Sequence, residues 1–69
     1  MGESDKERWD AVKGTVNATD FVKFAGDMAT FNKEYKGSGM SKSDAMQSLL
    51  NGYGNLSDTQ KDALFGAYS

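Results

Sequence analysis

The 69-residue sequence predicts an all-α fold, a compact bundle of four short helices that forms one domain over residues 1–69. Four segments begin with a helix-capping motif and continue with apolar residues at helical spacing. Isoleucine is absent, valine occurs three times, and no segment alternates apolar and polar residues with the period of a strand. These observations favour helices over about 5–16, 18–36, 42–52 and 58–68.

The first predicted helix, residues 5–16, is the weakest of the four. Ser4 and Glu7 have the spacing of a capping box, in which each side chain bonds the other residue's backbone amide. The apolar stripe is narrow and consists of Trp9, Val12 and Val16. Gly14 and the two β-branched residues after it disfavour the last turn. A three-helix bundle with this segment partly frayed is therefore the alternative, and residues 1–4 are expected to be flexible.

The second predicted helix, residues 18–36, is expected to be the central one. Asn17 caps its start, and Asp20 lies in the first turn, where the helix dipole favours a negative charge. Val16 and Phe21 have the spacing of a hydrophobic staple across this cap. The apolar face is broad and consists of Phe21, Val22, Phe24, Ala25, Met28, Ala29, Phe31 and Tyr35. It covers about half of the helix circumference, so it must contact more than one neighbour.

The third and fourth predicted helices, residues 42–52 and 58–68, have similar starts. Ser41 and Ser57 are each followed by an aspartate in the first turn, a typical N-terminal pattern. Their apolar faces contain Ala45, Met46, Leu49 and Leu50 in the third helix, and Leu64, Phe65 and Tyr68 in the fourth. Segment 37–39, Gly-Ser-Gly, is expected to be a flexible linker. The third helix is expected to end in a left-handed cap at Gly52 or Gly54.

The composition argues against several classes of function. Cysteine and histidine are both absent, which excludes thiolate nucleophiles, imidazole bases and the commonest zinc ligands. The acidic residues are scattered over caps and polar helix sides. We therefore expect no catalytic residue, no metal or other cofactor, and no enzymatic activity. The absence of cysteine favours the cytoplasm, and no stretch is long and apolar enough for a signal sequence or a membrane span.

The aromatic residues of the second helix carry the main functional hypothesis. Rings can simply fill a core that lacks isoleucine, but four short helices leave one edge of this helix without an obvious cover. If the aromatic edge is exposed, it forms a protein-binding patch with a polar rim. The candidate partner-binding residues are Phe24, Phe31, Tyr35, Lys23 and Asp27. The chain would then be an interaction module, an inhibitor, adaptor or regulatory subunit of bacterial or phage type, and a homo-oligomer is possible.

A helix-turn-helix nucleic-acid-binding protein is the alternative. The helices over 42–52 and 58–68 would form the motif, with Gln60 and Lys61 as the nucleic-acid-binding residues of its second helix and Gln60 suited to pair with adenine. Phosphate neutralisation dominates affinity for DNA. Residues 37–69 contain two lysines against three aspartates, and the whole chain has a net charge of −2. Nucleic acid is therefore not the expected partner.

Overall fold

A computed structural model describes the backbone of residues 3–35 and 37–69 and the side chains of residues 4–34 and 37–69. Within these residues the chain forms four α-helices and no strand, so the predicted all-α fold is confirmed. The helices are α1 (Glu3–Val12), α2 (Ala18–Tyr35), α3 (Lys42–Asn51) and α4 (Asp58–Tyr68). Lys36, the last residue of the predicted second helix, lies outside the described residues.

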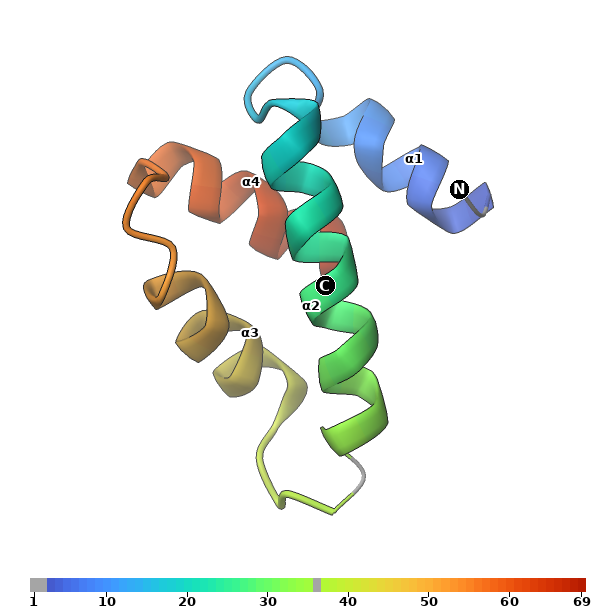
Figure 1. Cartoon of the computed structure of the whole chain (residues 1–69), viewed down its shortest axis with the longest axis vertical. Helices are drawn as coiled ribbons and strands as arrows, with labels where there is room; N and C mark the ends of the chain where they lie inside the picture. Colours follow the sequence, from blue (N-terminus) through green and yellow to red (C-terminus); the bar gives the residue numbers. More distant parts are fainter. Residues whose placement is uncertain (1–2, 36) are drawn as a thin grey trace.

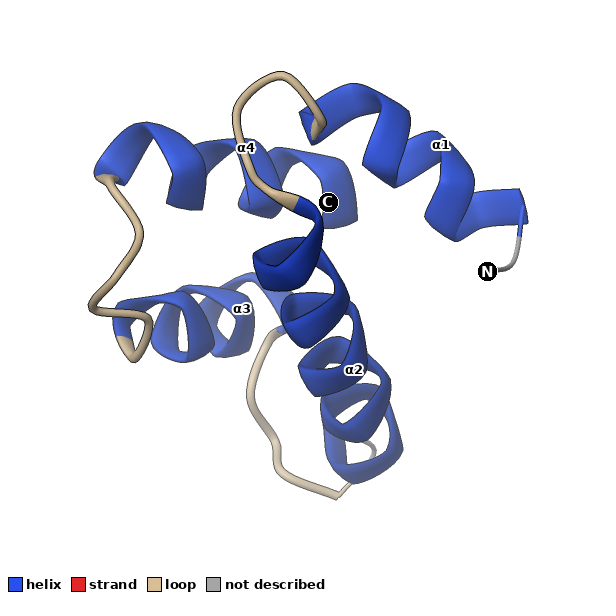
Figure 2. Ribbon diagram, turned by 45° about the horizontal axis from the view of Figure 1, so that its top comes forward, coloured by secondary structure: helices blue, strands red, loops and turns tan. Residues whose placement is uncertain are grey.

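The helices pack in two layers. In Figure 1, α2 crosses in front of the end of α4. Figures 1 and 2 show α3 and α4 running in roughly opposite directions on either side of their connection. The described chain extends over 34 × 27 × 17 Å. The short dimension fits two layers, because packed helix axes lie about 8–10 Å apart and each backbone adds a radius of about 2.3 Å on both sides. The longest helix, α2, therefore forms one layer, and the other three helices form the second.

The N-terminal caps follow the sequence motifs in three of the four helices. The side-chain oxygen of Asn17 accepts from the amide of Asp20 at 2.8 Å, and that of Ser41 accepts from the amide of Asp44 at 3.1 Å. Ser57 and Gln60 form a complete capping box before α4. Each bond satisfies an amide that has no partner within its own helix. These caps place the starts of α2, α3 and α4 where the sequence predicts them.

The first helix differs from its prediction at both ends. It begins at Glu3, so Ser4 lies inside the first turn and is not the N-cap. It ends at Val12, four residues earlier than predicted. The chain turns at 13–15, where the amides of Thr15 and Val16 share the Val12 carbonyl at 2.8 and 2.9 Å. Gly14 and Thr15 are poor helix formers. The turn brings Val16 into the core just before α2.

The end of α3 corrects a second prediction. Gly52 has φ −77° and ψ −10°, which is right-handed, and Gly54 has no positive φ either, so the left-handed cap expected at one of these glycines is wrong. The last turn tightens instead. The Gly52 amide bonds the Leu49 carbonyl at 3.1 Å, and the Tyr53 amide bonds the Leu50 carbonyl at 2.9 Å. These bonds join residues three apart, as in a 3₁₀-helix, and satisfy the carbonyls of Leu49 and Leu50 at the end of α3. The tightened turn directs Tyr53 into the core. Among the described glycines, Gly39 in the linker adopts a positive φ, 73°.

The core lies between the two layers and is rich in aromatic rings. The Phe24 side chain is fully buried, 0% exposed. Its ring packs edge to face against the rings of Tyr68 and Tyr53, with centroids 5.1 and 5.8 Å away. The quadrupoles of aromatic rings favour this geometry. Phe24 thus connects α2 to α4 and to the α3–α4 connection. The buried cluster consists of Val12, Val16, Phe21, Phe24, Met28, Met46, Leu50, Tyr53, Leu56, Leu64 and Tyr68.

The first helix is attached to the bundle by specific contacts. The Trp9 ring packs on Phe21 with centroids 5.2 Å apart, and the Arg8 guanidinium lies 4.5 Å from the centroid of the buried Tyr68 ring. Such a cation over an aromatic face is attractive. The helix also lies against α4. The four-helix prediction is therefore confirmed. Of the segment expected to be flexible, residues 3 and 4 belong to α1, and residues 1 and 2 lie outside the described residues.

A polar cluster around Asp20 fixes the start of α2 to the α3–α4 connection. One carboxylate oxygen of Asp20 accepts from the Asn17 side-chain amide at 3.0 Å, and the other accepts from the Asn55 side-chain amide at 3.1 Å. The contact with Asn55 spans 35 residues of sequence. This hydrogen bond therefore holds the start of α2 against the α3–α4 connection, a contact that no local sequence motif predicts.

Tyr53 makes the stability of the fold sensitive to alkaline pH. Burial, and secondarily a hydrogen bond from its hydroxyl to Asp27, raise the pKa of Tyr53 well above its usual 10.0. Below pH 10 the folded and unfolded chains both keep this proton, so the phenol adds no pH dependence. Above pH 10 the unfolded chain ionises first, and the free energy of unfolding should fall by up to about 1.4 kcal/mol per pH unit.

Urea denaturation at neutral pH and at pH values rising to about 11 measures this effect. We expect the variant Tyr53→Phe to lose the part of the alkaline slope that this phenol supplies, while the contribution of Tyr68, whose pKa burial also raises, remains. An alkaline slope identical in Tyr53→Phe and the unmodified chain would contradict this assignment.

Candidate functional site

The aromatic edge predicted as a binding patch is largely part of the core. Phe24 is 0% exposed, and Phe31 is half-buried and packs against the core cluster. Tyr35 ends α2, but its side chain lies outside the described residues. A fully buried ring is not accessible to a partner, so Phe24 must be withdrawn as a contact residue. The simpler interpretation, rings that fill the core, is the correct one at this position.

Lys23 and Asp27, the predicted polar rim of the patch, belong to a contact between α2 and Tyr53. The Lys23 ammonium lies 4.6 Å from the centroid of the Tyr53 ring. The Asp27 carboxylate accepts the hydrogen bond from the Tyr53 hydroxyl. The two side chains therefore bind the connection between α3 and α4 to α2. They surround a buried ring, and not an exposed patch as predicted.

The opposite edge of α2 faces the solvent. Ala18 and Ala29 are exposed, and Val22 has 61% of its surface accessible. The sequence places Val22 and Ala29 on the same broad apolar face as the aromatic residues. Burying the larger apolar area is more favourable, so the aromatic edge turns inward and the small residues remain outside.

The two residues of the nucleic-acid hypothesis do not form a common reading surface. The Gln60 side chain is engaged at both ends of its amide: its oxygen accepts from the Ser57 amide at 2.9 Å, and its nitrogen donates to the Thr15 carbonyl at 3.0 Å. Pairing with adenine would require both of these groups. Lys61, in contrast, lines a cleft between α3 and α4. Gln60 therefore contributes two hydrogen bonds to the fold, and a role in base recognition would require breaking both of them.

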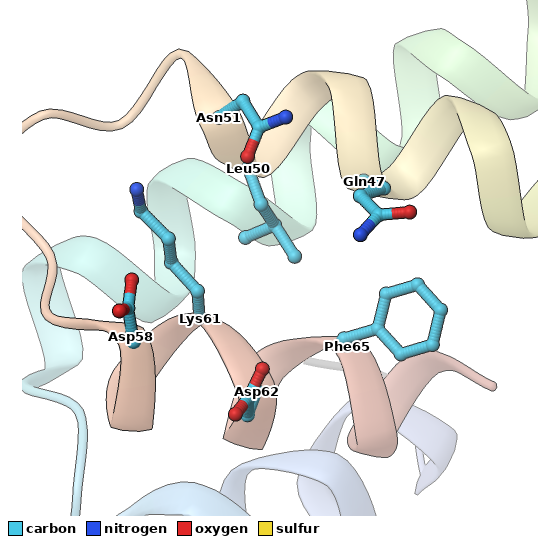
Figure 3. Close-up of a pocket in the computed structure, with 7 residues that line it drawn as sticks. All are labelled: Gln47, Leu50, Asn51, Asp58, Lys61, Asp62 and Phe65. Atoms are coloured by element: carbon cyan, nitrogen blue, oxygen red, sulfur yellow. The ribbon is translucent and has the colours of Figure 1, made fainter.

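The α3–α4 cleft has a volume of about 440 Å³. Gln47, Leu50 and Asn51 line it from α3. Asp58, Lys61, Asp62 and Phe65 line it from α4. Figure 3 shows Leu50 descending between the two helices, with the Phe65 ring at one end beneath Gln47 and Lys61 at the other, and with the ribbon of α2 behind them.

An apolar floor and a polar rim characterise the α3–α4 cleft. Leu50 is 3% exposed and belongs to the core cluster, so the floor of the cleft is the core itself. Phe65 is half-buried and packs against the same cluster. Two carboxylates and one ammonium give the α4 side a net charge of −1, and the α3 side adds two neutral amides. The cleft therefore offers an aromatic ring, hydrogen-bonding groups and a small excess of negative charge.

The charged groups of the cleft are not paired with one another. Among the described residues, ion pairs form between Arg8 and Asp5 at 3.2 Å and between Lys13 and Asp10 at 3.3 Å, both on or next to α1. Asp58 and Asp62 take part in neither. Asp58 lies in the first turn of α4, where the helix dipole stabilises its charge.

Sequence reasoning identified Lys61 but missed the α3–α4 cleft. Its lining residues look like an ordinary mixture of amides, acids and apolar side chains, with no motif at fixed spacing. The cleft lies above Leu50, between two short helices that the connection over 52–57 joins. The separation of these helices depends on tertiary packing, which the local sequence does not encode.

Comparison with protein-family models, curated proteins and solved structures found no match to this chain. In the described part of the chain, no helix combines the length and apolarity needed to cross a bilayer. The described residues also contain no group of three or more acidic side chains placed to hold a metal ion together.

Proposed function

We propose that the chain is a protein-interaction module, an inhibitor, adaptor or regulatory subunit of another protein, and that the α3–α4 cleft is its contact surface. The observation that carries this proposal is the cleft's composition: Leu50 forms an apolar floor and Phe65 an aromatic wall at one end, with amides and charged groups around them. An apolar centre with a polar rim is the usual anatomy of a protein interface. The absence of cysteine favours the cytoplasm as the site of this function.

The size of the cleft indicates how a partner would use it. A volume of about 440 Å³ lies within the usual range of binding pockets, roughly 300–1,000 Å³. It suits one or two anchoring side chains of a partner that covers the surrounding surface of α3 and α4. Anchors of this kind contribute most of the binding energy in many interfaces. In this proposal the chain acts by binding and performs no chemistry of its own.

Two tryptophan variants on α3 test the proposed surface. Gln47 is exposed and lines the cleft, whereas its neighbour Ser48 is also exposed and does not line it. We expect Gln47→Trp to fill the cleft and reduce recovery of the partner at least about tenfold, while Ser48→Trp keeps it. The measurement is a tagged pull-down from nuclease-treated lysate of the source cells, with mass spectrometry and with circular dichroism to show that both variants are folded.

Equal recovery with both variants would contradict the cleft as the contact surface. A parallel sample without nuclease tests the alternative function. Recovery that disappears on nuclease treatment would replace the proposal with nucleic-acid binding, in which case the contact residues would have to be sought outside Gln60.

A further inference from the structure

The arrangement of charges in the α3–α4 cleft favours a cation. Asp58 and Asp62 are four residues apart on α4, so they lie on the same side of the helix. Like charges at this spacing disfavour the helix that carries them. Lys61 compensates one of the two charges and leaves the excess of one negative charge. A positive group brought by a partner would remove this repulsion, whereas a phosphate or carboxylate would increase it.

The aromatic and apolar residues of the cleft favour a guanidinium over other cations. The Phe65 ring stands at one end of the cleft, and the Leu50 side chain forms an apolar floor. A guanidinium is planar and weakly hydrated, so it stacks on an aromatic face, while its methylene groups cover apolar surface. Its nitrogens donate to carboxylates in a fixed fork. Gln47 and Asn51 add amide oxygens that accept from the remaining N–H groups.

We propose that the α3–α4 cleft binds an arginine side chain of the partner protein, an inference that rests on the function proposed above. The guanidinium lies between the Asp62 carboxylate and the Phe65 ring, and Asp58 contributes to the negative potential. A purely apolar anchor fits less well, because it would remove water from the amides and carboxylates without replacing their hydrogen bonds. A lysine ammonium lacks the planar face that stacks on the ring.

The side-chain chemistry is tested with N-acetyl-arginine amide, titrated into the folded chain and followed by amide chemical shifts. We expect shifts at the residues that line the cleft and a dissociation constant on the order of 1 mM, the usual strength for a ligand of this size. N-acetyl-citrulline amide is a neutral analogue of nearly the same shape. It should cause no comparable shifts, because it lacks the charge that the carboxylates recognise.

Two variants that each remove one charge should change the affinity for the arginine probe in opposite directions. Asp62→Asn removes a negative charge and should weaken binding roughly two- to fivefold, whereas Lys61→Gln removes the competing positive charge and should strengthen it by a similar factor. Asp44→Asn is the control, because Asp44 is an exposed acid on α3 that does not line the cleft. Its effect should be close to zero. Amide spectra show whether each variant is folded.

The proposal is wrong if the citrulline probe binds as well as the arginine probe, if the shifts lie outside the cleft, or if Lys61→Gln weakens binding. These results are independent of the tryptophan pull-down. Loss of the partner in Gln47→Trp without binding of the arginine probe would keep the proposed function and remove arginine as its anchor. Binding of the probe with unchanged partner recovery would remove the proposed function.

Discussion

Replacing Phe24 with alanine is expected to unfold the chain. The side chain is 0% exposed and its ring packs against Tyr53 and Tyr68, so the substitution leaves a cavity at the junction of α2, α4 and the α3–α4 connection. Phenylalanine-to-alanine changes in a core cost about 3–5 kcal/mol. A single core in a chain of this size rarely supplies more than about 3–5 kcal/mol in total. The variant should therefore lose most of its helical signal in far-ultraviolet circular dichroism at room temperature.

Val22→Ala is the matched control on the same helix. Val22 is 61% exposed, and changes at such positions stay within about 0.5 kcal/mol. A urea titration of both variants compares the two sides of α2 directly. If Phe24→Ala unfolds at the same urea concentration as the unmodified chain, the aromatic edge of α2 is not buried. That edge would then again be a candidate binding patch.

Replacing Gln60 with alanine should have the second largest effect, about 2 kcal/mol. The substitution removes the bond from the Ser57 amide, which completes the cap of α4, and the bond to the Thr15 carbonyl, which ties α4 to the α1–α2 connection. Gln60→Glu keeps an oxygen for the cap but has no N–H group for Thr15. Its loss should be intermediate, about 1 kcal/mol. Urea denaturation measures both values.

Thr59→Ala provides the control for the Gln60 variants, since Thr59 is the exposed neighbour in the same helical turn. It should leave stability nearly unchanged. A Gln60→Ala variant as stable as Thr59→Ala would show that the two hydrogen bonds contribute nothing. The comparison also matters for function, because any loss of binding in Gln60→Ala would reflect a weakened fold and not a lost base contact.

The helices could be predicted because their signals are local. Ser41, Ser57 and Asn17 are each followed within three residues by the amide that they cap, so the motif and the structure coincide. The apolar spacing in α2 likewise indicates a helix without any knowledge of its neighbours. The end of α1 was harder to place, because Gly14 and Thr15 weaken a helix without fixing the residue at which it stops.

The candidate site could not be predicted in the same way, because it depends on which surfaces meet. Periodicity shows that α2 has two apolar edges, but the burial of Phe24 and the exposure of Val22 follow from the positions of Tyr53 and Tyr68, distant in sequence. The α3–α4 cleft is similar: its existence depends on the separation of two helices. The double role of Gln60 also required the fold, because Thr15 is 45 residues away.

The central claim, that the α3–α4 cleft is the contact surface, is tested most directly by photo-cross-linking in the source cells. A photoreactive phenylalanine analogue replaces Gln47 in the cleft or Val22 on the exposed edge of α2, both accessible positions. We predict one cross-linked protein from position 47 and none from position 22. A cross-link from position 22 alone would contradict the claim and would move the contact surface to α2.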